Sequence, residues 1–85
     1  MKVLLFAAIR DAADGAREVH VDATTVPALV AELADRYGEV MARRLEVASV
    51  MVDGTKVARD DDTVRLLEAD EVAVVPPFAG GATAD

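Results

Sequence analysis

Two strand-length apolar segments lie near the two ends of this chain, and each is apolar on both of its alternating faces. The first spans residues 2–9. The second spans residues 71–75 and ends at Pro76 and Pro77, because proline supplies no N–H to a strand ladder. A strand that is apolar on both faces belongs inside a sheet. We therefore expect the first and last strands to lie side by side in the middle of one sheet.

The middle of the chain carries the pattern of one amphipathic helix, with charged side chains opposite a single apolar face. Thr24 or Thr25 can cap the start of this helix, Pro27 is tolerated in its first turn, and Gly38 can end it. The apolar face consists of Val26, Leu29, Val30, Leu33 and Tyr37. We expect that losing this face would unfold the domain.

Turn signals on either side of the helix predict two hairpins. Residues 11–15 form a polar turn, and residues 18–22 then alternate as the return strand of the first hairpin. A β-branched run over residues 47–52 leads into the Asp-Gly pair at 53–54, which is the strongest short hairpin signal in the chain, and residues 55–58 return.

The order of elements is hairpin, helix and further strands, which is the ββαββ arrangement of a β-grasp, or ubiquitin-like, roll. The predicted fold class is therefore α+β, with a mixed sheet and one main helix on one face. A ferredoxin-like fold would need a second full helix, and residues 39–46 are too short and too charged to supply it. We expect a short irregular or helical connector there.

One helix can cover only one face of this sheet. The central strands place apolar side chains on the other face as well, among them Leu4, Phe6, Ala8, Ala73 and Val75. Either the sheet twist and the loops cover this face, or a partner protein does.

Length and composition restrict the classes of function. The chain has 85 residues, which allows one small domain, at residues 1–77, and makes an independent enzyme with its own deep cleft improbable. Its net charge of −7 disfavours nucleic acid and anionic membranes and favours a basic partner. The lack of cysteine excludes disulfides and thiolate metal sites. Arg10 and Asp11 follow the first apolar run too early for a signal peptide, so a cytoplasmic protein is expected.

Three polar features are expected at the surface rather than in a site. The consecutive acids at residues 60–62 match no calcium loop and predict a solvated turn. His20 has no second histidine or cysteine to share a metal with. Arg43 and Arg44 are expected on a solvated helix face. The sequence therefore predicts no metal site and no bound cofactor.

The chain continues past the last strand as a tail, residues 78–85. Nothing remains after the two prolines to form another element, so an extended, flexible segment is expected. From Phe78 to Gly81 such a segment reaches about 13 Å, enough to enter another protein's active site. A glycine pair alone is a weak signal, but this pair follows a strand, a rigid Pro-Pro spacer and one aromatic residue.

Three segments of the chain resemble a known family. They are residues 2–10 (KVLLFAAIR), residues 52–54 (VDG) and residues 70–81 (DEVAVVPPFAGG). Together they resemble the small subunit of molybdopterin synthase, one of the ubiquitin-like sulfur carriers. The most specific part is the ending Pro-Pro-x-x-Gly-Gly after a Glu-Val-Ala strand.

The resemblance implies a carrier rather than an independent enzyme. An activating enzyme would adenylate the carboxylate of Gly81 with ATP and convert it to a thiocarboxylate, which would deliver sulfur to a pterin precursor in the large subunit's active site. Gly80 would be its unhindered neighbour, since glycine has no Cβ. No Walker-type loop is present, so the activating enzyme would bind the ATP. The expected partner-binding residues are Phe78, Ala79 and Pro77 along the tail, and Phe6, Leu4 and Val75 on the uncovered sheet face.

The chain departs from the family pattern at two places. Ala69 stands where the family usually has glycine, and residues 82–85 follow the glycine pair at which the carriers end. A peptide-bonded Gly81 has no carboxylate to activate. Three explanations stay open: a protease removes residues 82–85, the protein only binds a partner, or an expression vector adds these residues.

Two other functions also stay open. One is sulfur delivery to another product, such as thiazole or cysteine. The other is a ubiquitin-like binding module or modifier without sulfur chemistry, in which Gly81 would join a lysine of a target protein.

Overall fold

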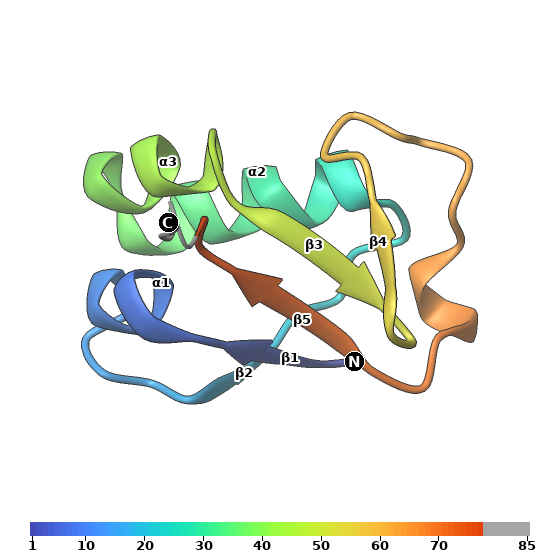
Figure 1. The fold of residues 1–85 in the computed structure, drawn as a ribbon, viewed down its shortest axis with the longest axis horizontal. Coiled ribbons are helices and arrows are strands. Elements are labelled where there is room, and N and C mark those ends of the chain that lie inside the picture. The colour runs from blue at the N-terminus through green and yellow to red at the C-terminus, as the bar shows by residue number, and fades with distance from the viewer. Residues whose placement is uncertain (78–85) are drawn as a thin grey trace, which may run out of the picture.

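The computed structural model describes residues 1–77 of the chain as one sheet with helices packed on one of its faces. Figure 1 shows the sheet in front of α2, with α1 and α3 together at one end. The strands are β1 Lys2–Leu5, β2 Glu18–His20, β3 Ser49–Val52, β4 Thr55–Val57 and β5 Val72–Val75. The helices are α1 Ala7–Ala12, α2 Val26–Tyr37, α3 Glu39–Leu45 and the short 3-10 helix η1 Leu66–Glu68. The predicted tail, residues 78–85, lies outside the described residues.

The strand order of the sheet is β2-β1-β5-β3-β4. β1 pairs with β5 in parallel, and all other neighbours pair antiparallel. The first and last strands therefore lie side by side, as their apolar pattern predicted, and β5 is the middle strand. With α2 across one face, this mixed sheet is the predicted β-grasp roll.

Helix α2 spans the predicted segment and is capped as expected. The Thr25 hydroxyl accepts a hydrogen bond from the Ala28 N–H at 3.3 Å, which satisfies one of the unpaired donors of the first turn. Gly38 follows with φ +95°, a conformation that glycine adopts without strain. Val26, Leu29 and Leu33 are fully buried against the sheet, and Val30 and Tyr37 are partly buried beside them.

The first strand is shorter than predicted, and this expectation was wrong for residues 6–9. β1 ends at Leu5, Ala7 takes φ +49°, and the chain then forms α1. An apolar run cannot by itself distinguish a buried strand from a buried helix, and alanine at positions 7, 8 and 12 favours the helix. Ile9, which we placed in the strand, is fully buried from the helix instead. The polar turn correspondingly begins at Ala13 rather than at residue 11.

The connector after α2 is a second packed helix, α3. Met41 and Leu45 are buried in the same core as α2, so this helix seals the end of the sheet beside α1. Arg43 is solvated as expected and pairs with Glu39. Arg44 is not: its Nη1 donates a 2.6 Å hydrogen bond to the carbonyl of Ala8 in α1, so it joins two helices.

The second hairpin forms at Asp53 and Gly54, with φ values of +51° and +82°. The Asp53 carboxylate also accepts hydrogen bonds from the N–H groups of Asp70 and Glu71, at 2.9 and 2.8 Å, and so ties the turn to the start of β5. Ala69, which replaces the glycine of the family pattern, has φ −84°, so this turn needs no glycine. No helix in residues 1–77 is both long and apolar enough to cross a membrane.

Candidate docking face and tail exit

Alternate residues of the central strands point to opposite faces of the sheet. Val3, Leu5, Val50, Val72 and Val74 face the helices and are almost fully buried. The alternating residues Leu4, Met51, Ala73 and Val75 form the apolar part of the outer sheet face, and strand pairing places Leu4 opposite Ala73 and Ala73 opposite Met51.

No helix of the described chain covers the outer sheet face (Figure 1). Its apolar strip runs across three neighbouring strands, and Leu4, Met51 and Val75 are each partly exposed. Of the two explanations that the sequence left open, cover within the domain holds for Ala73, which is 8% exposed, and not for Leu4, Met51 and Val75 around it. An apolar surface of this kind is typical of a face that binds another protein.

Phe6 lies at the end of this strip, although it is not a strand residue. It is the N-cap residue of α1, and its extended backbone (φ −121°, ψ 145°) continues the alternation of β1, so its side chain shares the face of Leu4. Its N–H donates to the carbonyl of Val74, and its side chain is 39% exposed. Ala8, which we also expected on this face, lies in α1 instead.

A hollow of about 510 Å³ opens where β5 ends. Its lining is apolar except for one hydroxyl and one charged side chain, and it comprises Val47, Ser49, Met51, Lys56, Val75, Pro76 and Pro77. Pro76 is buried and Pro77 is exposed, so the chain leaves the sheet at the rim of this hollow.

The structure brings together only some of the predicted site residues. Leu4, Phe6 and Val75 share the outer sheet face, and Pro77 stands beside it at the exit of the chain. Phe78, Ala79, Gly80 and Gly81 lie outside the described residues. Their roles stay predictions.

Sequence reasoning did not find the part of the hollow that is formed by β3, β4 and the residues just before β3. Lys56 lies directly opposite Met51 across the hairpin, and Val47 is 63% exposed just before β3. The Asp-Gly turn was a usable signal, because counting back from it along both strands places Met51 and Lys56 on one face.

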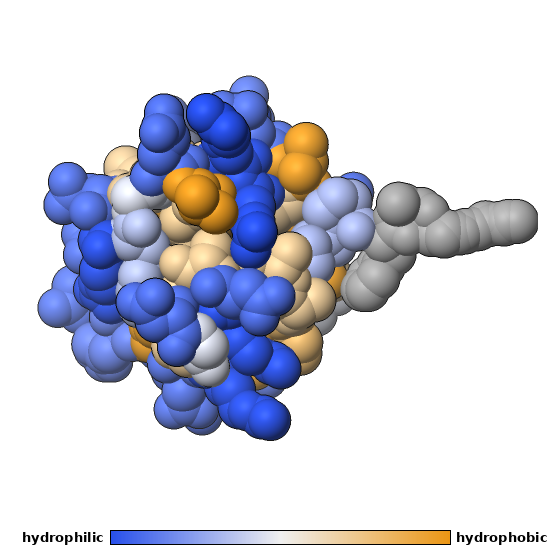
Figure 2. Space-filling model, turned by 90° about the vertical axis from the view of Figure 1, so that its left-hand side faces the viewer, coloured by the Kyte–Doolittle hydropathy of each residue, from blue (hydrophilic) through white to orange (hydrophobic). Residues whose placement is uncertain are grey.

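The end of the molecule formed by α1 and α3 has a different surface. Figure 2 looks onto this end, where the hydrophobic residues lie as spots interrupted by hydrophilic ones. Val40 of α3 is the large apolar side chain most exposed on these two helices, at 55%. This end therefore offers a mixed surface rather than an apolar strip.

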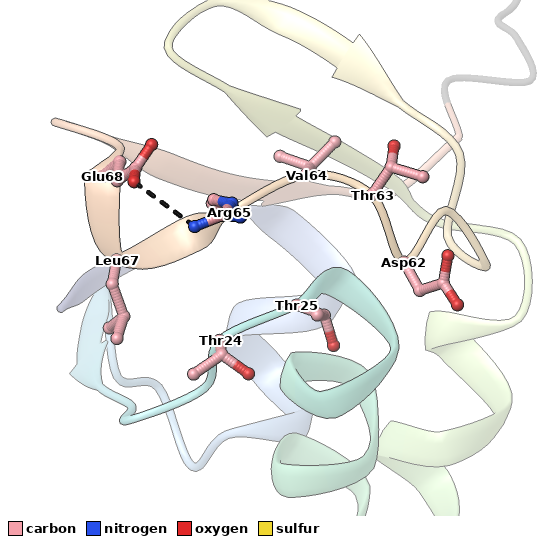
Figure 3. A pocket seen from close by; sticks show the side chains of 8 residues that line it. All are labelled: Thr24, Thr25, Asp62, Thr63, Val64, Arg65, Leu67 and Glu68. Atoms are coloured by element: carbon pink, nitrogen blue, oxygen red, sulfur yellow. Dashed lines mark ion pairs between the residues drawn. The ribbon is translucent and has the colours of Figure 1, made fainter.

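A second hollow, of about 530 Å³, lies at the other end of the sheet from the exit of the chain (Figures 1 and 3). It is formed by Thr24 and Thr25 before α2 and by the loop from Asp62 to Glu68, where Arg65 and Glu68 pair at 3.9 Å. Within residues 1–77 no cluster of acidic or histidine side chains could hold a metal ion.

The remaining polar candidates are surface residues, as predicted. The Asp61 carboxylate accepts hydrogen bonds from the hydroxyl and the N–H of Thr63, and these bonds lower the pKa of Asp61 below its usual value. His20 is 73% exposed and contacts the N-terminal amine and Asp22.

Comparison with known proteins places the chain in a family. The sequence profile of the ThiS family matches residues 3–81. The fold is similar to that of SAMP1 from Haloferax volcanii, with 27% identity, a TM-score of 0.69, and coverage of 94% of this chain and 97% of that one. The small archaeal modifier protein 1 from Methanosarcina acetivorans is 24% identical, with a TM-score of 0.70 and 94% of each chain covered.

A third similar structure is CysO from Mycobacterium tuberculosis, described as an antigen, with 16% identity, a TM-score of 0.69, and coverage of 88% of this chain and 96% of that one. These likenesses agree with the sheet order and the position of α2 described above. A search of curated proteins found no match. Because the family profile covers nearly the whole chain, the protein belongs to the ThiS family of ubiquitin-like sulfur carriers and modifiers.

Proposed function

We propose that this protein is a sulfur carrier that acts as the small subunit of a molybdopterin synthase. In this proposal Gly81 carries the sulfur as a C-terminal thiocarboxylate and delivers it to a pterin precursor in the large subunit. The observation that carries the carrier role is the extent of the family match, which ends at the second glycine of the Gly-Gly pair, and the choice of the molybdopterin pathway rests on the resemblance of residues 2–10, 52–54 and 70–81 to that small subunit.

The architecture supports a carrier that presents its chain end to other proteins. β5 is hydrogen-bonded on both sides, to β1 and β3, so the chain leaves the domain from the middle strand of the sheet. Pro76 and Pro77 restrict the backbone at the exit. The four residues from Phe78 to Gly81 can span at most about 13 Å beyond it.

The chemistry needs a free carboxylate at Gly81. A carboxylate oxygen attacks the α-phosphorus of ATP and releases pyrophosphate, and a hydrosulfide ion then displaces AMP from the acyl carbon and loses its proton to leave a thiocarboxylate. Ubiquitin-like sulfur carriers work with E1-like activating enzymes, which in our proposal bind the ATP. The carrier contributes an acyl group without a Cβ beside it and is not an enzyme on its own.

A free carboxylate at Gly81 requires the removal of residues 82–85. We therefore include a processing protease in the proposal. Mass spectrometry of the protein from its native cell tests this step: a chain that ends at Gly81 is expected. Finding only the 85-residue chain would overturn the carrier function.

The decisive experiment compares a chain that ends at Gly81 with the 85-residue chain. Each is incubated with ATP, the activating enzyme and a sulfur donor. The shorter chain is expected to gain the mass difference between sulfur and oxygen, while the longer chain stays unchanged. Adding the large subunit and the pterin precursor should return the shorter chain to its first mass. If the shorter chain gains no sulfur, the proposal is overturned.

A second candidate function is protein modification, favoured by the 27% identity to SAMP1 from Haloferax volcanii. Here the Gly81 carboxyl forms an isopeptide bond with a lysine amine of a target. A search of tryptic digests for glycine-modified lysines tests it. Sulfur delivery to thiazole or cysteine differs from our proposal only in the acceptor, so the protein that copurifies with the carrier distinguishes these pathways.

A further inference from the structure

The cationic side chains of this acidic chain are mostly engaged within it. Three arginines donate hydrogen bonds to main-chain carbonyls, and three others pair with glutamates on the same or a neighbouring turn. The first group is Arg10, Arg44 and Arg59, and the second is Arg36, Arg43 and Arg65. These six arginines therefore have structural partners already.

Lys56 differs from these arginines in its surroundings. It is exposed on β4, a strand at the edge of the sheet, and forms no ion pair or side-chain hydrogen bond with another residue of 1–77. Its position opposite Met51 places it on the outer sheet face. It is also the one charged residue in the lining of the hollow at the chain exit.

The other charged residues of this face lie elsewhere on it. Glu18 of β2 is opposite Leu4, at the far edge of the sheet from β4. Lys2 precedes Val3, which pairs with Val72, so Lys2 lies near Glu71 at the start of β5 rather than at its end. Among the residues that line the hollow, the charge is therefore the ammonium group of Lys56.

We propose that the hollow at the chain exit binds an apolar side chain of the activating enzyme, and that a carboxylate next to that side chain pairs with Lys56. The inference rests on the proposed function, because a protein that accepts the tail must cover the surface from which the tail leaves. The apolar lining formed by Val47, Met51 and Val75 accepts the side chain, and Lys56 selects for the neighbouring acid.

This contact pairs a positive side chain of the carrier with an acidic residue of the partner, whereas the net charge of −7 favours a basic partner. Overall charge steers two proteins from a distance, whereas a charge at the rim of a contact acts on the group that it touches. An activating enzyme with a basic surface elsewhere is compatible with an acidic residue at this hollow. Reversing the charge of Lys56 separates the two effects. It makes the carrier more acidic and so strengthens the long-range attraction to a basic surface, but it removes the ion pair at the hollow.

The test measures binding of the carrier to its activating enzyme by titration calorimetry. The carrier ends at Gly81, a length that retains every helix and strand of the described structure. Lys56→Glu is expected to raise the dissociation constant about tenfold, and Lys56→Gln about threefold. Lys56→Arg keeps the charge and should bind within about twofold of the unaltered protein.

The matched control is Arg65→Glu, which makes the same change in net charge in the loop at the other end of the sheet. It should alter the dissociation constant less than about twofold. In sulfur loading, Lys56→Glu should raise KM for the carrier and leave kcat unchanged. Unchanged or tighter binding of Lys56→Glu would falsify the inference.

Failure of the inference is distinguishable from failure of the proposed function. An unaltered carrier that gains sulfur while Lys56→Glu binds equally well overturns only the role of Lys56. An unaltered carrier that binds the activating enzyme but gains no sulfur overturns the proposed function, and the order of affinities among the Lys56 variants still decides the contact.

Discussion

The two faces of the sheet use the same strands for different purposes. Val3, Leu5 and Val74 point to the helices and are fully buried, whereas their direct neighbours Leu4 and Val75 point outward and stay partly exposed. Alternation along a strand sets the face of each side chain, because successive side chains leave on opposite faces, although Ala73 on the outer face of β5 is also buried, at 8% exposure. A one-residue step therefore moves a side chain from the packed core to the outer face of the sheet.

The largest effect should come from the inner face. Leu5→Ala is expected to lower the free energy of unfolding by about 2–5 kcal/mol, since it removes buried methyl groups and leaves a cavity. Leu4→Ala, the same change one residue earlier, should cost less than about 1 kcal/mol. Urea denaturation measures both. Equal losses would contradict the assignment of the two faces.

Substitutions on the outer face should weaken partner binding rather than lower the free energy of unfolding. Phe6→Asp places a charge at the end of the apolar strip and is expected to weaken binding of the activating enzyme about thirtyfold or more. The melting temperature should stay close to that of the unaltered protein, because Phe6 is 39% exposed.

Val40→Asp is the control for this change, as it introduces the same charge at an exposed apolar residue of α3. It should bind within about twofold of the unaltered protein, given the cost of a lone surface substitution outside a contact. If both variants lose binding equally, the docking surface extends over α3 and is not the outer sheet face.

Among the helices that cover the inner face, Arg44 should contribute more to the stability of the fold than its neighbour Arg43. Arg44→Met removes the hydrogen bond to the Ala8 carbonyl and should lower the free energy of unfolding by about 1–3 kcal/mol, because a partly buried, charge-assisted bond between α1 and α3 is lost. Arg43→Met removes only an exposed ion pair, worth at most about 0.5 kcal/mol. Thermal denaturation of both variants at one pH tests this difference.

The smallest effect concerns a residue on neither face. The pKa of Asp61 is lowered mainly by the Thr63 hydroxyl, so its NMR titration midpoint should lie below 3.8. A lowered pKa stabilises the folded state above that pH, and the contribution disappears as the pH falls through the folded value. Thr63→Val should move the midpoint up toward 3.8 and leave partner binding unchanged. A midpoint that does not move would assign the shift to the Thr63 N–H alone.

Local sequence patterns predicted those elements whose ends are marked by capping, turn or proline residues of their own. Thr25 and Gly38 marked the ends of α2, Asp53 and Gly54 marked the second hairpin, and the two prolines marked the end of β5. The strand-to-helix change at Ala7 carried only a weak signal, because the apolar run continues through it and only the helix propensity of the alanines at positions 7, 8 and 12 marks the change. The bond from Arg44 to Ala8 joins residues 36 positions apart and could not be read from local pattern.

By itself, the sequence determined the β-grasp order, the central place of the first and last strands, and the Gly-Gly ending by which the family was suspected. These features follow from periodicity, from turn residues and from proline, which act over a few neighbouring positions. Only the tertiary structure decided which apolar residues stay uncovered, and that Lys56 lines the same hollow as Val75 and Pro77 at the chain exit. The physical reason is that hollows and charge contacts arise where strands distant in sequence pair in one register, and that register is set by the packing of the whole core.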